Sequence, residues 1–151
     1  MSLIEFFVPG IPAPQGSKTY LGQGRMVESS KAVRPWRAIV AATAHVAMMG
    51  HPPLDEPLAV HVEFYFARPK GHFTSKGQLT KSAPRLPIGH NLGDVDKLLR
   101  ALLDGGTGIV WRDDCLVVEV SAMRRYHEIP GCHVSVESAL TPEVIGLPFS
   151  E

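Results

Sequence analysis

The segment Gly93–Gly106, GDVDKLLRALLDGG, carries the pattern that most restricts the fold of this 151-residue chain. Its apolar residues recur at the spacing i, i+3, i+4, i+7 and i+8, which predicts a helix with one buried face. They are Val95, Leu98, Leu99, Leu102 and Leu103. Asp94 stands at the expected N-cap, and Gly105-Gly106 is expected to end the helix. Such a helix packs its apolar face against a second layer of structure.

Alternating residues elsewhere predict that the second layer is a β-sheet. Residues 58–66 alternate between an apolar face and a polar face, which is typical of a strand with one covered side. Further strands are predicted at Leu3–Val8, Leu116–Met123 and His133–Glu137, and a second helix at Trp36–Met49. We expect the last two strands to be antiparallel neighbours across the turn Glu128–Gly131. The order β-α-β-loop-α-β-β predicts a single α/β domain with a mixed β-sheet flanked by helices.

Three segments lack a clear period and are expected to be irregular. Gly10–Arg25 is rich in glycine and proline, which is typical of a loop. Arg68–Asn91 would be a long loop for a compact domain, and loops of that length are usually functional or disordered. The chain is therefore expected to form one domain over residues 1–140, followed by a tail over residues 141–151.

The composition, 44% hydrophobic and 20% charged, is typical of a soluble globular protein. No apolar run approaches the ~20 residues that a membrane-spanning helix needs, and the N-terminus lacks the features of a signal peptide. Cys115 and Cys132 form no CxxC pair, so we expect unbridged thiols and a cytoplasmic protein.

The charges are unevenly distributed, although the formal net charge is zero. The segment Lys18–Arg37 has five basic residues against Glu28 alone, and Arg68–Arg85 has five basic residues and no acid. Acidic residues gather instead at 94–104, at 113–119 and in the tail. This distribution suits a protein that binds a polyanion and also holds a metal ion. Scattered, solvated charge is the alternative explanation.

Asp94 and Asp96 allow two interpretations. Acidic residues at a helix start satisfy backbone N–H groups and complement the helix dipole, so they can simply stabilise the helix. Lys97 does not fit that purpose, because the dipole disfavours a cation there. Asp113-Asp114 is also typical of a turn. If the strand after it runs alongside the helix, Asp114 comes close to Asp94 and Asp96, and three clustered carboxylates favour a hard cation such as Mg²⁺.

Other sequence signals for a catalytic site are weaker. The seven histidines show no zinc-ligand spacing, and PAPQGSKT lacks the first glycine of a Walker A loop. His90 is either a proton carrier or polar surface, and Cys115 has no base partner in the sequence. Lys18 and Arg37 are candidate phosphate contacts, with solvated surface as the alternative.

Three stretches together resemble the RusA family of Holliday-junction resolvases, in particular its phage-borne members. They are VPGIPAPQGSK at residues 8–18, the pair Trp36-Arg37, and GDVDKLLRALLDGGTGIVWRDDCLVVEV at residues 93–120. The most specific feature is the combination of DxDxxxR/K, a short helix, and WxDD before a strand.

The resemblance implies a RusA-like, homodimeric, Mg²⁺-dependent endodeoxyribonuclease that cuts four-way DNA junctions symmetrically, with Mn²⁺ as a substitute metal. The family's catalytic and metal-binding carboxylates fall on Asp94, Asp96 and Asp114. Its basic catalytic residue, commonly lysine, falls on Arg100, which can stabilise a transition state but cannot act as a general acid. The expected DNA contacts are Lys18, Arg37, Lys76 and Lys97.

Three alternatives remain open on the sequence alone. The first is a structure-tolerant or flap-cutting endonuclease with the same site. The second is a non-catalytic DNA-binding accessory protein, in which the acidic residues are caps and turns. The third is an α/β domain unrelated to DNA.

Overall fold

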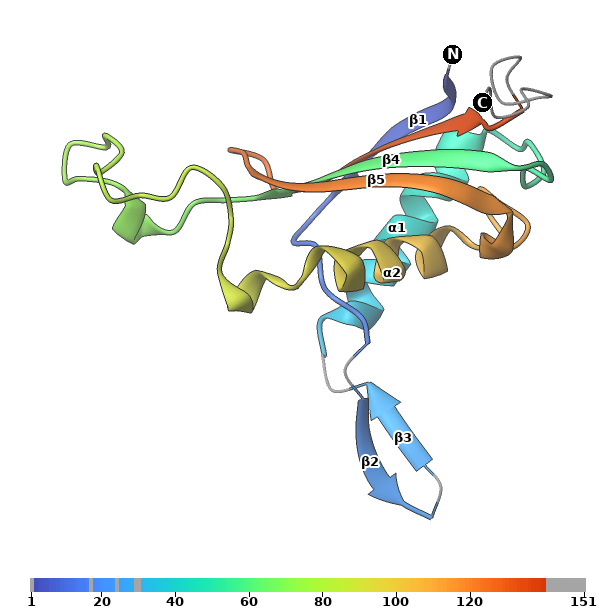
Figure 1. Ribbon diagram of the computed structural model, residues 1–151, viewed down its shortest axis with the longest axis horizontal. Coiled ribbons are helices and arrows are strands. Elements are labelled where there is room, and N and C mark those ends of the chain that lie inside the picture. The colour runs from blue at the N-terminus through green and yellow to red at the C-terminus, as the bar shows by residue number, and fades with distance from the viewer. Residues whose placement is uncertain (1, 17, 24, 29–30, 141–151) are drawn as a thin grey trace, which may run out of the picture.

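The computed structural model describes residues 2–16, 18–23, 25–28 and 31–140, and its centre is a four-stranded mixed sheet (Figure 1). The strands are β1 (Ser2–Pro9), β4 (Leu58–Phe66), β5 (Val117–Tyr126) and β6 (Gly131–Ser138). Their order is β1-β6-β4-β5, with β4 and β5 parallel and the other neighbours antiparallel. The predicted single α/β domain with a mixed sheet is confirmed.

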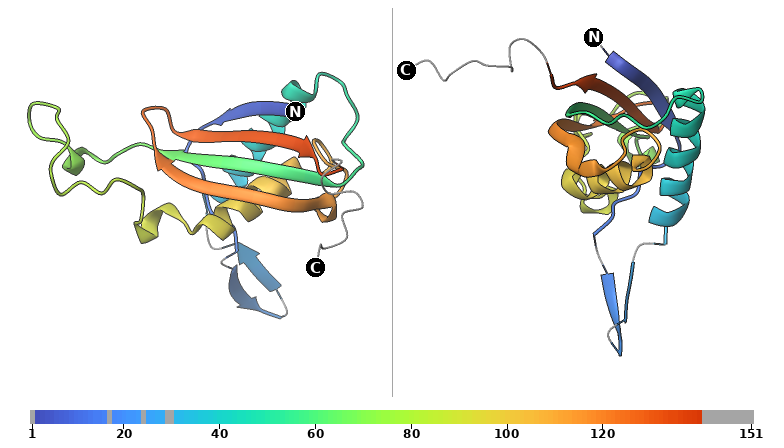
Figure 2. Two further views of the ribbon diagram at one scale, coloured as in Figure 1. Left: turned by 45° about the horizontal axis from the view of Figure 1, so that its top comes forward. Right: turned by 90° about the vertical axis from the view of Figure 1, so that its right-hand side faces the viewer.

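Two helices, α1 (Val33–Met48) and α2 (Val95–Gly106), cover one face of the sheet, and no other described helix covers the opposite, open face (Figure 2). The core lies between these layers, where fully buried residues of β4 and β6 meet Trp36 and Val40 of α1 and Leu98 and Leu102 of α2. The two helices approach closely at Gly105, because an added Cβ there would lie 2.8 Å from Cγ1 of Val40. None of the described helices is long and apolar enough to cross a membrane.

The last two strands, β5 and β6, run antiparallel as predicted, but their expected direct pairing is wrong, because β4 lies between them. The connection crosses the end of β4, where the backbone N–H of His127 donates to the carbonyl of Phe66 at 2.9 Å. Skipping one strand spans two sheet spacings, roughly 10 Å, and four extended residues can reach about 13 Å. A short turn therefore does not by itself define strand neighbours.

Part of the segment expected to be a loop forms a β-ribbon. The strands β2 (Lys18–Gly22) and β3 (Arg25–Glu28) pair antiparallel and project from the domain (Figure 1). Gly22 and Gln23, at the turn, have positive φ angles of 88° and 54°, which is typical of tight hairpin turns. Both cysteines are free thiols; Cys132 is buried and Cys115 is exposed. The predicted tail, residues 141–151, lies outside the described residues.

Candidate active site

An open cavity of about 420 Å³ runs along the exposed side of α2 and contains three carboxylates. Asp96, Arg100 and Asp104 are spaced by four residues and therefore follow one side of the helix. Asp114, from the segment before β5, also lines the cavity. Gln15, Leu99 and Leu103 complete its lining. The structure thus brings three of the predicted site residues, Asp96, Arg100 and Asp114, to one cavity.

Asp94 occupies the N-cap position of α2, but its side chain makes no capping hydrogen bond. The carboxylate is 64% exposed and lies 4.0 Å from Nζ of Lys97. The interpretation of Asp94 as a simple cap therefore does not describe its side chain, which stays available to a ligand. Asp94 does not line the cavity that contains Asp96 and Asp114.

The start of α2 is fixed by Gly93. Its φ is +91°, and an added Cβ would lie 2.8 Å from Cβ and Cγ of Pro14. The carbonyl of Gly93 accepts a hydrogen bond of 2.9 Å from Nη1 of Arg124 on β5. Only a residue without a side chain fits this backbone conformation and this close approach. The direction in which Asp94 leaves the loop is therefore set by contacts from two other segments.

Gln15 connects the two helices beneath the cavity. Its backbone N–H donates to the carbonyl of Lys97 at 3.0 Å, and its side chain is only 8% exposed. The amide nitrogen donates to the carboxylate of Asp104, and the amide oxygen accepts from Nη1 of Arg37 at 2.8 Å. A buried polar group with both ends satisfied holds its neighbours in a fixed arrangement.

Gln15 and Asp104 were not among the sequence-predicted site residues. Both left a signal in the sequence. Gln15 lies inside the VPGIPAPQGSK stretch, and Asp104 follows Asp96 by eight residues, which places the two carboxylates on one side of a helix.

The adjacent pair Asp113-Asp114 divides into one turn residue and one cavity residue. Asp113 caps the short 3₁₀ helix η3 (Asp114–Leu116), since its carboxylate accepts from the backbone N–H of Cys115 at 3.0 Å. That backbone hydrogen bond lowers the pKa of Asp113. Partial desolvation raises the pKa of Asp114, and the neighbouring Asp113 and the charge of Asp104 raise it further. The carboxylates at the cavity therefore repel one another in the absence of a cation.

Replacing Asp113 with asparagine should lower the pKa of Asp114. The amide can still cap η3, but it removes the negative charge beside Asp114, so the ionised form of Asp114 becomes easier to reach. The measurement is a pH titration of carboxyl ¹³C signals in the metal-free protein. The pKa of Asp114 should move toward its ordinary value and stay above it, because desolvation, the largest cause, remains. An unchanged or higher pKa would contradict this account.

The donors at this cavity suit a hard divalent cation. Carboxylate and amide oxygens are the groups that Mg²⁺ accepts, and mutual repulsion among the acidic residues is what such an ion relieves. Among the described residues, no three histidine, cysteine or acidic side chains already form a compact ligand cluster. The chemistry of the donor set thus fits a metal that is also held by its own waters and by a substrate phosphate.

The predicted DNA contacts fall at different distances from the cavity. Arg37 binds Gln15 beneath it, and Lys97 lies beside Asp94. Lys76 lies in a turn of the loop 68–91 and does not line the cavity. Lys18 begins β2, and its side chain, like that of His90, lies outside the described side chains.

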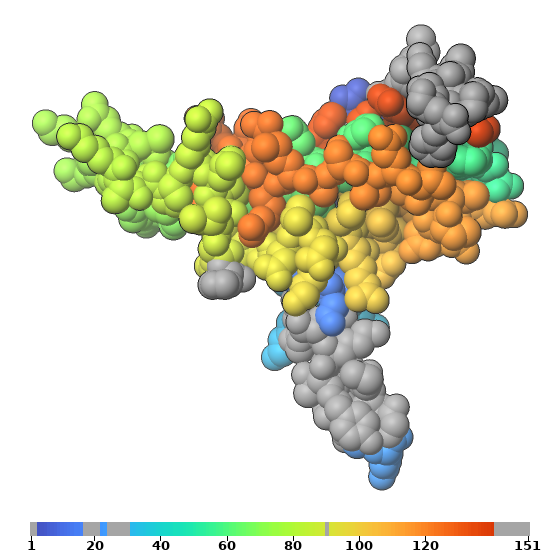
Figure 3. All heavy atoms as spheres, in the orientation of Figure 1, coloured from blue at the N-terminus to red at the C-terminus, as the bar shows by residue number. Residues whose placement is uncertain are grey.

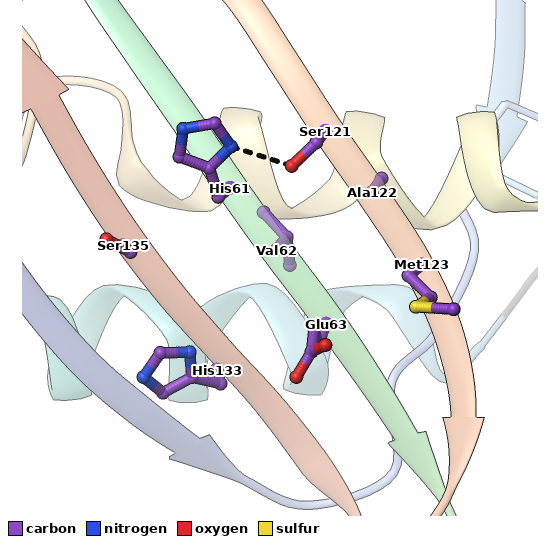
Figure 4. A pocket seen from close by; sticks show the side chains of 8 residues that line it. All are labelled: His61, Val62, Glu63, Ser121, Ala122, Met123, His133 and Ser135. Carbon is purple, nitrogen blue, oxygen red and sulfur yellow. Dashed lines mark hydrogen bonds between the residues drawn. The ribbon is translucent and has the colours of Figure 1, made fainter.

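A larger cavity of about 660 Å³ lies over the open face of the sheet, with the helices behind it (Figure 4). Its Ser121 Oγ and His61 Nδ1 form a hydrogen bond of 2.7 Å, an arrangement found in nucleophilic enzymes. Glu137 lies 3.9 Å from the other nitrogen of His61, which is too long for a hydrogen bond. The nearby backbone N–H groups lie within paired strands, where ladder bonds compete with any role as an oxyanion hole. The cavity on α2 is the better candidate active site.

Comparison with known proteins found one family. The family model described as Endodeoxyribonuclease RusA matches residues 9–137, a range that contains the cavity on α2 and Asp94. A search of curated proteins found no match.

Proposed function

The chain belongs to the RusA family of endodeoxyribonucleases, and we propose that it resolves four-way DNA junctions by paired, Mg²⁺-dependent nicks. The observation that carries the proposal is the meeting of Asp96, Arg100 and Asp114 at one cavity. Two separate segments of the chain place two carboxylates and the guanidinium of Arg100 at one cavity. Phosphodiester hydrolysis uses such a combination of metal-binding acidic groups and a fixed positive charge.

Asp94, Asp96 and Asp114 are the proposed metal ligands, for Mg²⁺ or in its place Mn²⁺. When bound, the cation supplies Lewis-acid polarisation of the phosphate and a water of lowered pKa. Asp96 and Asp114 line the cavity. The assignment of Asp94 as a ligand is supported by its own carboxylate, which makes no capping hydrogen bond. Asp104 adds negative charge to the cavity while Gln15 holds its carboxylate.

Arg100 is proposed to stabilise the charge that develops on the scissile phosphate. Its guanidinium can donate two parallel hydrogen bonds to phosphate oxygens and keeps its proton throughout. The backbone of Gly16 lies beside it, since an added Cβ would be in van der Waals contact with Nη1 of Arg100, at 3.5 Å. The backbone of the PAPQG stretch therefore borders the group that would meet the phosphate.

Lys18, Arg37, Lys76 and Lys97 are proposed to bind DNA through its backbone phosphates. Phosphate contacts position the substrate without reading its sequence, so affinity should fall steeply with salt. A homodimer with two-fold symmetry is proposed for the active form. It would present two equal sites to the two equivalent strands of a junction.

Cleavage of a synthetic four-way junction tests this function. The protein is incubated with the junction, with a flap and with linear duplex, each in Mg²⁺ and in EDTA. We expect symmetrical nicks in the junction that require Mg²⁺ and are absent from the duplex. Equal cutting of the flap would favour a structure-tolerant nuclease. An intact junction in both Mg²⁺ and Mn²⁺ would remove the catalytic assignment.

A further inference from the structure

The long basic loop 68–91 is ordered around Arg68 and projects from the end of the sheet (Figure 3). The guanidinium of Arg68 donates to the carbonyls of Pro84 at 2.7 Å and of Arg85 at 3.4 Å. It also lies over the ring of Tyr126, whose centroid is 4.2 Å away, and its Nη1 is 3.4 Å from Nδ1 of His72. Arg68 therefore ties both ends of the loop's basic segment to the end of β5.

Inside the loop, Phe73 and Leu79 form a small apolar platform. They are paired as an antiparallel bridge. The flanking hydrogen bonds run from Thr74 to Gln78 at 2.7 Å and from Thr80 to His72 at 2.9 Å. Phe73 and Leu79 are thus a non-hydrogen-bonded pair, the type in which opposite side chains lie closest. They remain 40% and 54% exposed.

A cavity of about 490 Å³ is lined by this platform and by residues at the end of β5. Phe73, Leu79 and Arg85 of the loop line it together with Tyr126, His127 and Glu128. The size lies within the range of small-molecule sites, and the half-exposed ring of Phe73 in its lining can stack on a planar group.

The positive charge of the loop indicates that the planar group carries a negative charge. Between Arg68 and Arg85 there are five basic residues and no acid. The guanidinium of Arg85 forms no hydrogen bond or ion pair within the described part of the chain, so it is free to meet an anion. Glu128 is the one acid of the lining, and it can accept hydrogen bonds from a base edge. A planar group attached to a phosphate matches this combination.

We propose that this cavity binds a single unpaired base of branched DNA, with its phosphate on Arg85. The inference rests on the proposed function and adds a substrate contact outside the acidic cavity. Base extrusion costs least where pairing is already disrupted, as it can be at a branch point. Stacking on the exposed ring of Phe73 offsets that cost and does not depend on the base sequence.

The position of the cavity supports this role. Arg124 holds the carbonyl of Gly93, the residue before Asp94. Tyr126 lies two residues further along β5 on the same face, about 7 Å away. The proposed base site and the start of the metal-binding segment are therefore joined through one stretch of β5.

Binding to a bulged duplex tests the proposal without cleavage. Affinities are measured in EDTA for a duplex with one unpaired nucleotide and for the same duplex fully paired. Wild type should prefer the bulge by between about fivefold and about a hundredfold, the range of one base stack. Phe73→Ala/Leu79→Ala should lose that preference and keep its affinity for paired duplex. Phe73→Trp should retain the preference.

Ile88→Ala is the matched control, because Ile88 is an exposed apolar residue of the same loop, 74% exposed, that does not line the cavity. It should leave the preference unchanged. A 5-iodouracil placed at the bulge should photocrosslink to the peptide that contains Phe73 or to the one that contains Tyr126. Equal affinity of wild type for bulged and paired duplex would overturn the base site even if junctions are cleaved. Failure of cleavage, with the bulge preference intact, would instead remove the proposed catalysis alone.

Discussion

Replacing Asp96 with asparagine should lower the rate of Mg²⁺-dependent junction cleavage by about a thousandfold or more, with little loss of junction binding. The amide keeps the size of the side chain but removes a negative oxygen from the cavity that also contains Arg100 and Asp114. Loss of one preorganised charged group at a reacting centre typically costs 10²–10³, and loss of a ligand that holds a catalytic ion costs at least as much. DNA affinity should be unchanged or slightly higher, since a negative charge near phosphate has been removed.

The measurement is single-turnover nicking of a four-way junction, paired with a binding assay in EDTA. Glu119→Gln is the matched control, because Glu119 is an exposed acid on β5 that does not line the cavity. It undergoes the same change of carboxylate to amide and should cleave at the wild-type rate. If Asp96→Asn cleaved within tenfold of wild type while folded normally, the acidic cavity on α2 would not be the catalytic centre.

The predictable parts of the fold were those with a strong local period. The strand 58–66 and the leucine face of α2 were found because burial of one face leaves a period in the sequence. The neighbour of β5 was mispredicted, since strand pairing is set by packing between distant segments. The ribbon β2–β3 was missed because its glycines, which serve a tight turn, also resemble a loop.

The part of the candidate site that follows from helix geometry was predictable from the sequence. Asp96 and Arg100 lie one turn apart on any helix, so their proximity followed from spacing alone. The approach of Asp114 depended on the path of the chain after α2, and the structure places it at the same cavity. Gln15 could not be placed by spacing, because it reaches α2 from the segment after β1.

The segment that delivers Asp114 depends on one buried side chain, Trp111. Its ring is fully buried and packs against Gly106, where an added Cβ would lie 2.6 Å from Cζ2. Its Nε1 donates to the carbonyl of Leu103 and to Oγ1 of Thr107, both at 3.2 Å. Trp111 thereby holds the segment between α2 and β5 against the last turn of α2.

Replacing Trp111 with alanine should lower the free energy of unfolding by about 3–5 kcal/mol, the usual cost of removing a large buried ring. This is a large part of the 5–15 kcal/mol that holds a typical domain together, so the melting temperature should fall sharply. Urea denaturation provides the measurement. A change below about 1 kcal/mol would show that the segment is held by other contacts.

The two buried tryptophans offer a matched pair that isolates the hydrogen bond. The indole N–H of Trp36 has no hydrogen-bond partner among the described residues, whereas that of Trp111 has two acceptors. Phenylalanine at either position removes similar volume, but only Trp111→Phe loses a satisfied hydrogen bond, which is shared between two acceptors and is worth about 1 kcal/mol. Trp111→Phe should therefore be the more destabilising change. It should also reduce junction cleavage more, because Trp111 anchors the segment that positions Asp114.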